Sequence, residues 1–329
     1  MDTPHTLQAA IVFFSDADRC FQYALKLRWP DSVVSCPRCG SEKHSFIKTR
    51  RIWFCAGCKK QFSVKVGTIF EDSPIGLDKW MVAMWLLANS KNGISSYELH
   101  RSIGVTQKSA WFMLHRIRET MKQNPVHTMG SHWGNPIEID EAFIGGKMKN
   151  MHRSKAMAIR ENAPIDRMEG YGTNLKNKIP VMGMLNRETR EVRAKVVPNV
   201  KRETRQNEIL KNVGFNAHVF TDQAVGYDNL DKVKNFTHKT VNHVTQYVNG
   251  RVHTNGIENF WSLLKRALGG TYVAVEPFHL DRYVDEQVFR FNNRRDMDDQ
   301  DRFEKIMGNV AGKRLTYAEL TGAGSATAL

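Results

Sequence analysis

The sequence predicts a multidomain α+β protein, and three features of the chain lead to this fold class. Four of the five cysteines gather between residues 36 and 58, among short strand-like stretches. Apolar residues at helical spacing follow over residues 77–122. From residue 137 to residue 294, strand-like and helix-like segments alternate, which indicates a separate α/β domain built on a mixed sheet.

Length and composition are those of a globular chain. The 329 residues amount to roughly two average domains, enough to bury a sizeable core. Hydrophobic residues make up 41% and charged residues 25%, which argues against wholesale disorder. The longest apolar run has nine residues, well short of the roughly 20 that span a bilayer, and no secretory signal opens the chain. We therefore expect a cytoplasmic protein with no membrane partner.

Basic residues outnumber acidic ones along the whole chain. Lysine and arginine total 48 and aspartate and glutamate 34, a net charge of +14. An excess of this size favours a polyanionic partner such as nucleic acid, through phosphate contacts and counterion release. A basic protein that binds no polyanion is the alternative.

Four cysteines form two Cys-x-x-Cys pairs with 15 residues between them. They are Cys36, Cys39, Cys55 and Cys58. Each tight turn can present two thiolates to one ion, so the spacing predicts a four-thiolate structural Zn²⁺ site. Strand-like stretches at 46–48, 52–54 and 61–64 indicate a zinc ribbon, within an N-terminal domain of residues 1–70 that begins with a helix. Disulfides are disfavoured in a reducing cytosol, and a redox pair would not be doubled.

Residues 71–125 predict a helix-turn-helix DNA-binding domain. Ser95 and Glu98 have capping-box spacing, Gly104 interrupts the helix, and Thr106 can cap the next one. The basic residues of that next helix are Lys108, His115, Arg116, Arg118 and Lys122. We expect Lys108 and Arg116 to contact DNA, although any three-helix bundle could carry this pattern.

Residues 136–300 predict the α/β domain, and residues 301–329 a C-terminal tail. The expected strands are 137–144, 181–185, 192–197, 217–221 and 239–243, and the expected helices 203–213, 224–233, 256–268 and 277–294. The first three strands predict an antiparallel meander. Three strands followed by alternating helices and strands is the order of an RNase-H-like fold. The predicted insertion 145–178 holds eight basic and three acidic residues, so we expect a DNA-contacting loop with Lys147 and Lys149; a merely solvated loop is the alternative.

Three acidic residues stand out in this domain. Asp140 lies within an apolar strand, Asp222 directly follows the strand 217–221, and Glu258 lies in the first turn of a helix. Each has a simpler interpretation: a strand charge that faces water, an N-cap, or a capping-box partner of Asn255. In the predicted fold, however, the first and fourth strands are neighbours, so the three acids would converge. Converged carboxylates suit Mg²⁺ or Mn²⁺, which can assist phosphodiester displacement.

The segments around these acids resemble a known family. Ile137-Glu138-Ile139-Asp140-Glu141 with Gly145-Gly146, Phe220-Thr221-Asp222, and His253 to Trp261 with Lys265 look like the DDE transposases of bacterial insertion sequences. Within these transposases, the chain resembles the zinc-ribbon group related to Merlin elements. The resemblance extends from Cys36 to Arg294, most of the chain.

The resemblance implies a function and roles for particular residues. It implies an RNase-H-like catalytic domain with the triad Asp140, Asp222 and Glu258, cleavage of DNA at the element's ends, and joining of the 3′-hydroxyl to target DNA. We expect Mg²⁺ or Mn²⁺ at the triad and Lys265 on a substrate phosphate. Some relatives have asparagine as the third residue of the triad, and in this sequence Asn259 directly follows Glu258. The spacing of Glu258 to Asp222 and to Lys265 favours Glu258 as the third residue.

The expected partners are double-stranded DNA, as terminal inverted repeats and target, and a second copy of the chain in a homodimer on DNA. A nucleoid-associated location follows. Two other functions are open: a domesticated sequence-specific DNA-binding regulator with an inactive nuclease site, and an RNase-H-like repair nuclease.

Overall fold

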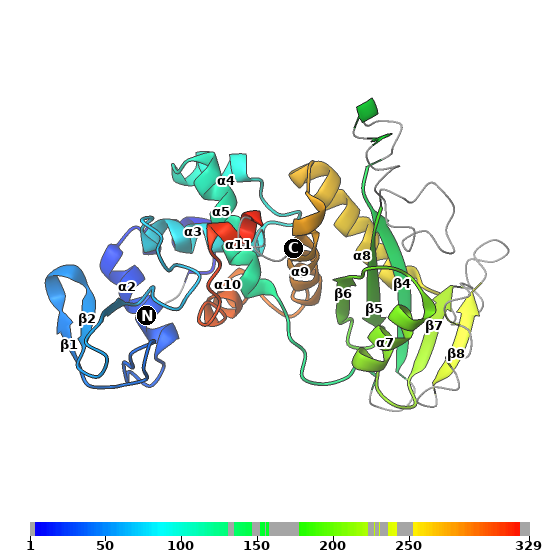
Figure 1. Ribbon diagram of the computed structural model, residues 1–329, viewed down its shortest axis with the longest axis horizontal. Helices are drawn as coiled ribbons and strands as arrows, with labels where there is room; N and C mark the ends of the chain where they lie inside the picture. The colour runs from blue at the N-terminus through cyan, green and yellow to red at the C-terminus, as the bar shows by residue number, and fades with distance from the viewer. Residues whose placement is uncertain are drawn as a thin grey trace. The chain divides into compact units, whose positions relative to one another are not determined.

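The computed structural model describes residues 4–130, 135–146, 152–154, 156–157, 178–222, 227, 230, 236–241 and 253–322. The chain divides into two compact units (Figure 1). One comprises Met1–Lys122 with Asn293–Leu329, and the other Gln123–Asn292. The segments predicted as an N-terminal ribbon domain and a helical domain therefore lie in one unit, which the C-terminal residues join.

Within the described residues of the first unit, three strands form an antiparallel sheet in the order β1-β2-β3. They are β1 (His44–Ile47), β2 (Ile52–Cys55) and β3 (Gln61–Ser63), close to the predicted stretches. Trp53 of β2 is 3% exposed, stacks on Phe62 at 5.5 Å between ring centroids, and contacts Phe21 and Trp29. So small a sheet has little apolar surface to bury, and these rings form its core.

Helices make up the rest of this unit. They are α1 (Leu7–Phe14), α2 (Ala17–Arg28), α3 (Leu77–Asn89), α4 (Ser96–Ile103), α5 (Gln107–Met121), α10 (Asp299–Gly308) and α11 (Tyr317–Thr321). The predicted boundary signals of α4 and α5 are confirmed: Ser95 and Glu98 form a capping box, Gly104 has φ +62° at the end of α4, and Thr106 caps α5. Within the described residues, no helix is both long and apolar enough to cross a membrane.

The C-terminal residues are part of this core rather than the predicted tail. Phe303 of α10 is fully buried. Its ring lies 5.3 Å from that of Phe14, 6.0 Å from that of Tyr23 and 5.3 Å from that of Trp85. Each of these partners lies more than 200 positions earlier in the sequence, so no local pattern could indicate the contact.

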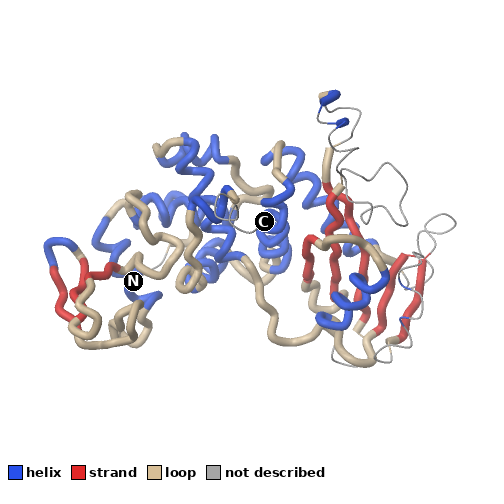
Figure 2. The backbone as a smooth tube through the Cα atoms, in the orientation of Figure 1, coloured by secondary structure: helices blue, strands red, loops and turns tan. Residues whose placement is uncertain are grey.

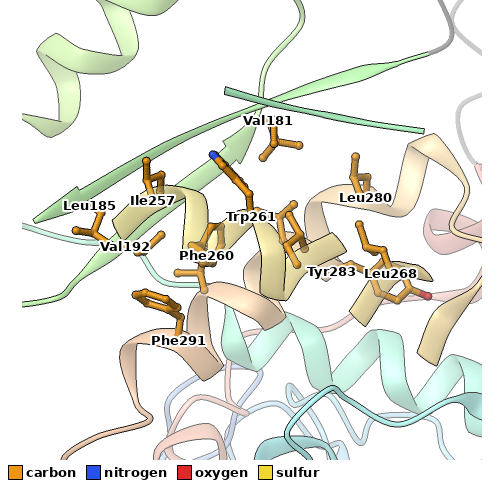
Figure 3. Close-up of a cluster of buried hydrophobic side chains, with 14 residues drawn as sticks. Val181, Leu185, Val192, Ile257, Phe260, Trp261, Leu268, Leu280, Tyr283 and Phe291 are labelled. Carbon is orange, nitrogen blue, oxygen red and sulfur yellow. The ribbon is translucent and has the colours of Figure 1, made fainter. Parts of the chain in front are cut away.

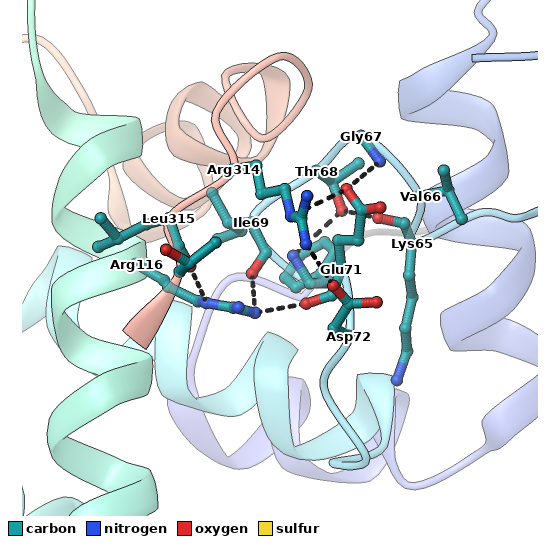
Figure 4. Close-up of polar contacts among 12 residues, drawn as sticks. Lys65, Val66, Gly67, Thr68, Ile69, Glu71, Asp72, Arg116, Arg314 and Leu315 are labelled. Atoms are coloured by element: carbon teal, nitrogen blue, oxygen red, sulfur yellow. Dashed lines mark hydrogen bonds and ion pairs between the residues drawn. The ribbon is translucent and has the colours of Figure 1, made fainter. Parts of the chain in front are cut away.

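The basic face predicted for α5 is largely buried. His115, Arg116 and Arg118 are between 0% and 4% exposed. The Arg116 guanidinium donates to the carbonyl oxygens of Leu315 (2.9 Å), Ile69 (2.9 Å) and Glu71 (2.7 Å), as Figure 4 shows. The prediction that Arg116 contacts DNA is therefore wrong, because its donors satisfy buried carbonyl groups of three separate segments. Lys108, near the start of α5, is exposed and lies 4.9 Å from the Tyr317 ring.

The second unit is built on a mixed sheet, as predicted. Its described strands are β4 (Pro136–Ile144), β5 (Ile179–Asn186), β6 (Val192–Val196), β7 (His218–Asp222) and β8 (Thr237–Val241). Among these residues they run in the order β6-β5-β4-β7-β8 (Figure 2). β4 pairs antiparallel with β5 and parallel with β7, and β8 continues the parallel side. Most of the predicted helix 224–233 and of the insertion 145–178 lies outside the described residues.

Helices cover both faces of this sheet. On one face α8 (Asn255–Arg266) and α9 (Leu280–Asn292) bury a core with β5 and β6 (Figure 3). On the other face, Ile209 of α7 (Arg202–Asn212) packs with Ile137 and Ile139 of β4. Since side chains alternate along a strand, Glu138 and Asp140 lie on the α8 face and Glu141 on the α7 face.

A first prediction concerns the buried cation of α5. We expect Arg116→Met to lower the free energy of unfolding by about 3 kcal/mol, because the three carbonyl groups lose a charged donor. The matched substitution Lys108→Met, on the same helix, should lower it by less than about 1 kcal/mol. Urea unfolding followed by circular dichroism measures both, and equal losses would contradict the structural role of Arg116.

Candidate active site and metal centre

Asp140 and Asp222 lie on the neighbouring strands β4 and β7. The last pair of the parallel ladder is Glu138 with Phe220, and each acid follows two residues later on the same side of its strand. Adjacent strands are about 4.8 Å apart, so the two carboxylates are close neighbours. Burial, together with the negative charges of Glu141 and Asp222, raises the pKa of Asp140 to about 7. The site thus concentrates negative charge that is not balanced at Asp140 itself.

Trp261 of α8 holds Asp140. Its indole Nε1–H donates to Asp140 Oδ2 at 3.0 Å, and the residue is 4% exposed. The ring lies over Gly183, the β5 residue that pairs with Asp140. A Cβ atom at position 183 would stand 2.6 Å from Trp261 Cζ2, so glycine is needed for this close approach. Trp261 is therefore a buried residue that also makes a polar contact to the site.

Glu138 is a buried charge that the sequence analysis did not single out. It is 0% exposed, accepts from the Ile257 backbone N–H at 2.8 Å, and pairs with Arg187 Nε at 2.6 Å. Arg187 also donates to the carbonyl oxygen of His253, just before α8 begins. The available signal was a second acidic residue, two positions before Asp140, in a strand otherwise rich in isoleucine.

Glu258 is exposed in the first turn of α8, beside the exposed Asn259. Its Oε1 accepts from the Thr254 hydroxyl at 2.8 Å, and the N-cap of α8 is Thr254 rather than the Asn255 of the capping-box interpretation. Lys265 is exposed on the same helix. Among the described residues, only the four cysteines form a group whose ligand atoms all lie within 4.8 Å of one another, so Asp140, Asp222 and Glu258 are not gathered that tightly.

A second buried network lies behind Asp140, on the α7 face. Glu141 accepts from Arg205 Nε at 2.7 Å and from the Tyr227 hydroxyl. Burial raises the pKa of Glu141 and, together with the charge of Glu141, that of Tyr227. Arg205 balances the Glu141 carboxylate with a positive charge, whereas Asp140 accepts from two uncharged donors, the Trp261 indole N–H and the Glu141 backbone N–H.

The predicted contacts with DNA differ in where they lie. Lys108 and Lys265 are exposed, each on its own unit. Lys147 and Lys149 lie outside the described residues.

The four cysteines are arranged for a metal ion. Sγ of Cys36 lies 3.8 Å from Sγ of Cys58, and Sγ of Cys39 lies 3.6 Å from Sγ of Cys55. A tetrahedron with Zn–S bonds of about 2.3 Å has edges of about 3.8 Å, so these residues fit Zn²⁺. The Cys58 backbone N–H lowers the pKa of Cys55 to about 6, which favours the thiolate that binds metal. Cys20, the fifth cysteine, is 1% exposed and lies in the core.

Comparison with known proteins adds independent findings. Residues 133–292 match the model of an ISXO2-like transposase domain, and residues 15–61 that of a transposase zinc-ribbon domain. An uncharacterized protein in transposable element ISH50 of Halobacterium salinarum is 28% identical over 260 residues, 78% of this chain and 84% of that protein. An uncharacterized transposase-like protein of Haemophilus influenzae is 38% identical over 98 residues, 30% of this chain and 78% of that protein.

A solved structure is similar only distantly. It is a chain of a simian T-cell lymphotropic virus intasome in complex with a PP2A regulatory subunit, with 13% identity and a TM-score of 0.28. The match covers 62% of this chain and 66% of that one.

We expect the ribbon to need its metal. The purified protein should hold about one zinc ion per chain, and a chelator should expose four reactive thiols and abolish the near-ultraviolet circular dichroism of the Trp53 cluster. Cys20 should stay unreactive, because burial raises its pKa to about 12. The Cys55→Ser variant should lose zinc and Cys20→Ser should keep it; a metal-free protein with the native spectrum would contradict this.

Asp140 should make stability depend on pH. Its pKa is about 7 in the folded chain and about 3.9 in an unfolded one, so the folded state holds the proton more tightly. The stabilisation is therefore complete below about pH 4 and lost as the pH rises through about 7. Without added divalent cation, Asp140→Asn should gain stability relative to the unsubstituted protein between pH 5 and pH 8. Melting temperatures are measured against pH for both proteins. A constant difference between the two over this pH range would contradict the raised pKa of Asp140.

Proposed function

This chain belongs to the ISXO2-like transposase family, and we propose that it is the DNA transposase of an insertion sequence, which cuts DNA at the element's ends and joins them to target DNA. The observation that carries the proposal is the adjacency of Asp140 and Asp222 on β4 and β7, with α8 hydrogen-bonded to Asp140 beside Glu258.

The donor set fits divalent magnesium or manganese. Asp140 and Asp222 repel each other, which helps to raise the pKa of Asp140, and a bound cation would remove that penalty. Carboxylate oxygens are the ligands that Mg²⁺ and Mn²⁺ prefer. The order β6-β5-β4-β7-β8, with three antiparallel strands beside two parallel ones, supports an RNase-H-like assignment for this domain.

Each residue then has a defined task. Asp140, Asp222 and Glu258 would hold the metal ions, which supply an activated attacking oxygen and stabilise the leaving oxygen. Trp261 orients the Asp140 carboxylate through the indole N–H that it donates to Oδ2. Thr254 orients Glu258 through the 2.8 Å hydrogen bond to its carboxylate. Lys265, exposed on α8, would contact a phosphate as a point charge.

The first unit would recognise the DNA ends. Its ribbon carries Lys48, Arg50 and Arg51 at the turn between β1 and β2, and α5 exposes Lys108. Phosphate contacts from such residues give salt-dependent affinity. A helix-turn-helix role for α4 and α5, contacts from Lys147 and Lys149, and a homodimer on DNA remain parts of the proposal.

The test is a nicking assay with a duplex that carries the end sequence flanking the gene, in Mg²⁺. We expect Asp222→Asn and Glu258→Gln to lower the nicking rate by about 10³-fold or more, while DNA affinity is kept. Each variant lacks a metal-binding carboxylate, so the negative charge of the transition state is no longer stabilised by the metal ion. Asn259→Ala, the matched neighbour, should change it by only a few-fold. Lys265→Ala should weaken DNA binding and reduce its salt dependence.

Three outcomes would contradict the proposal in different ways. Full activity of the Asp222→Asn variant would contradict the assignment of the catalytic triad. End-specific binding without cutting by the unsubstituted protein points to the regulator. Cutting of structured DNA without the end sequence, and without strand transfer, points to a repair nuclease.

A further inference from the structure

Helix α8 is tied to β4 at two points that lie one helical turn apart. The Ile257 backbone N–H donates to Glu138 Oε2 at 2.8 Å, and Trp261 Nε1–H donates to Asp140 Oδ2 at 3.0 Å. The two donors are four residues apart on a helix, a rise of about 6 Å, and the two acceptors two residues apart on a strand, about 6.6 Å. Because the spacings match, both bonds form at once.

Both contacts depend on glycine for space rather than for backbone conformation. A Cβ at position 183 would meet Trp261 at 2.6 Å, and one at position 256 would meet Glu138 Oε2 at 2.8 Å. Neither Gly183 nor Gly256 has a positive φ. Glycine at these two positions therefore lets the helix and the strand approach closely at both hydrogen bonds.

The Glu138 carboxylate caps the N-terminus of α8 in place of the Thr254 side chain. Thr254 precedes α8, yet its side chain makes no capping bond to the backbone, because its hydroxyl donates to Glu258. Glu138 accepts from the third residue of the helix instead, and Arg187 balances its charge. A negative charge at a helix N-terminus is favourable, so α8 is stabilised from β4 while Thr254 can hold Glu258.

Together these contacts leave one register for α8. A slip by a single residue would remove both hydrogen bonds and bury Glu138 without its backbone donor, a penalty of about 1–3 kcal/mol or more for a charged group. Glu258 directly follows Ile257, so the register of α8 sets where its carboxylate stands relative to Asp140.

We propose that Glu138 and Trp261 are positioning residues, which act as a two-point clamp that fixes α8 on β4 and thereby the relative placement of the metal-binding oxygens of Asp140 and Glu258. This inference rests on the proposed function. Neither residue touches the reacting atoms; each acts through an acid that does.

The test compares Trp261→Phe, which keeps the ring and removes only the N–H donor, with Trp85→Phe, a matched loss of a buried indole in the other unit. Titration calorimetry with Mn²⁺ measures metal affinity, and single-turnover nicking and DNA binding are measured alongside. We expect Trp261→Phe to weaken Mn²⁺ binding about 10-fold and to slow nicking 10- to 100-fold, as is usual for residues that orient metal ligands. Excess Mn²⁺ should restore part of the nicking rate, while DNA affinity stays within a few-fold of the unsubstituted protein.

Glu138→Gln provides the second arm. It keeps the shape of the side chain but loses the charge at the α8 N-terminus, and should raise the Mn²⁺ concentration for half-maximal nicking by a similar factor. A purely structural role would lower the melting temperature without moving this midpoint in the folded protein. A folded Trp261→Phe variant with unchanged Mn²⁺ affinity and nicking rate overturns the clamp alone. If the unsubstituted protein neither binds Mn²⁺ at Asp140, with Asp140→Asn as reference, nor nicks DNA, the proposed function falls and the clamp falls with it.

Discussion

The buried carboxylate of Glu138 is the constraint on which the second unit depends. A charge with no exposed surface needs partners, and it has them in the Ile257 backbone N–H and the Arg187 guanidinium. These bonds bring together the central strand, the turn after β5 and the start of α8. Since a carboxylate left unpaired in such a place is strongly destabilising, the three segments are held in one arrangement. Asp140 and Glu258 are carried by the same strand and helix, so their placement follows from it.

The arrangement of Asp140 and Asp222 destabilises the folded chain, because it brings negative charges together. Asp140 is brought beside Asp222 by the parallel pairing of β4 and β7, and burial together with the surrounding negative charge raises its pKa to about 7. On the other face of the same strand, Arg205 neutralises Glu141. One strand therefore carries a satisfied carboxylate on one side and an unbalanced one on the other. Unbalanced charge of this kind is typical of sites that bind cations, because the ligand supplies the missing counter-charge.

The first unit solves a different problem, that of holding a small ribbon together. Its small sheet has few apolar residues to bury, and the aromatic rings around Trp53 and four clustered cysteines take the place of a large core. Two buried side chains join the C-terminal segment to residues far earlier in the chain. The apolar Phe303 packs on Phe14, and the charged Arg116 donates a hydrogen bond to the Leu315 carbonyl oxygen. In this unit Arg116 and Arg118 are buried, so part of the net charge of +14 does not lie on the surface.

The sequence by itself determined what depends on neighbours within one element. The two cysteine pairs, the capping box at Ser95 and the acidic residues within β4 and at the end of β7 follow from spacing of a few residues, which backbone hydrogen bonding imposes locally. Only the tertiary structure decided that Arg116 is buried, that α10 completes the first core, and that Trp261 and Glu138 join α8 to β4. Those outcomes depend on partners more than 100 positions away, and a side chain's burial is set by what packs on it rather than by the period of the helix that carries it.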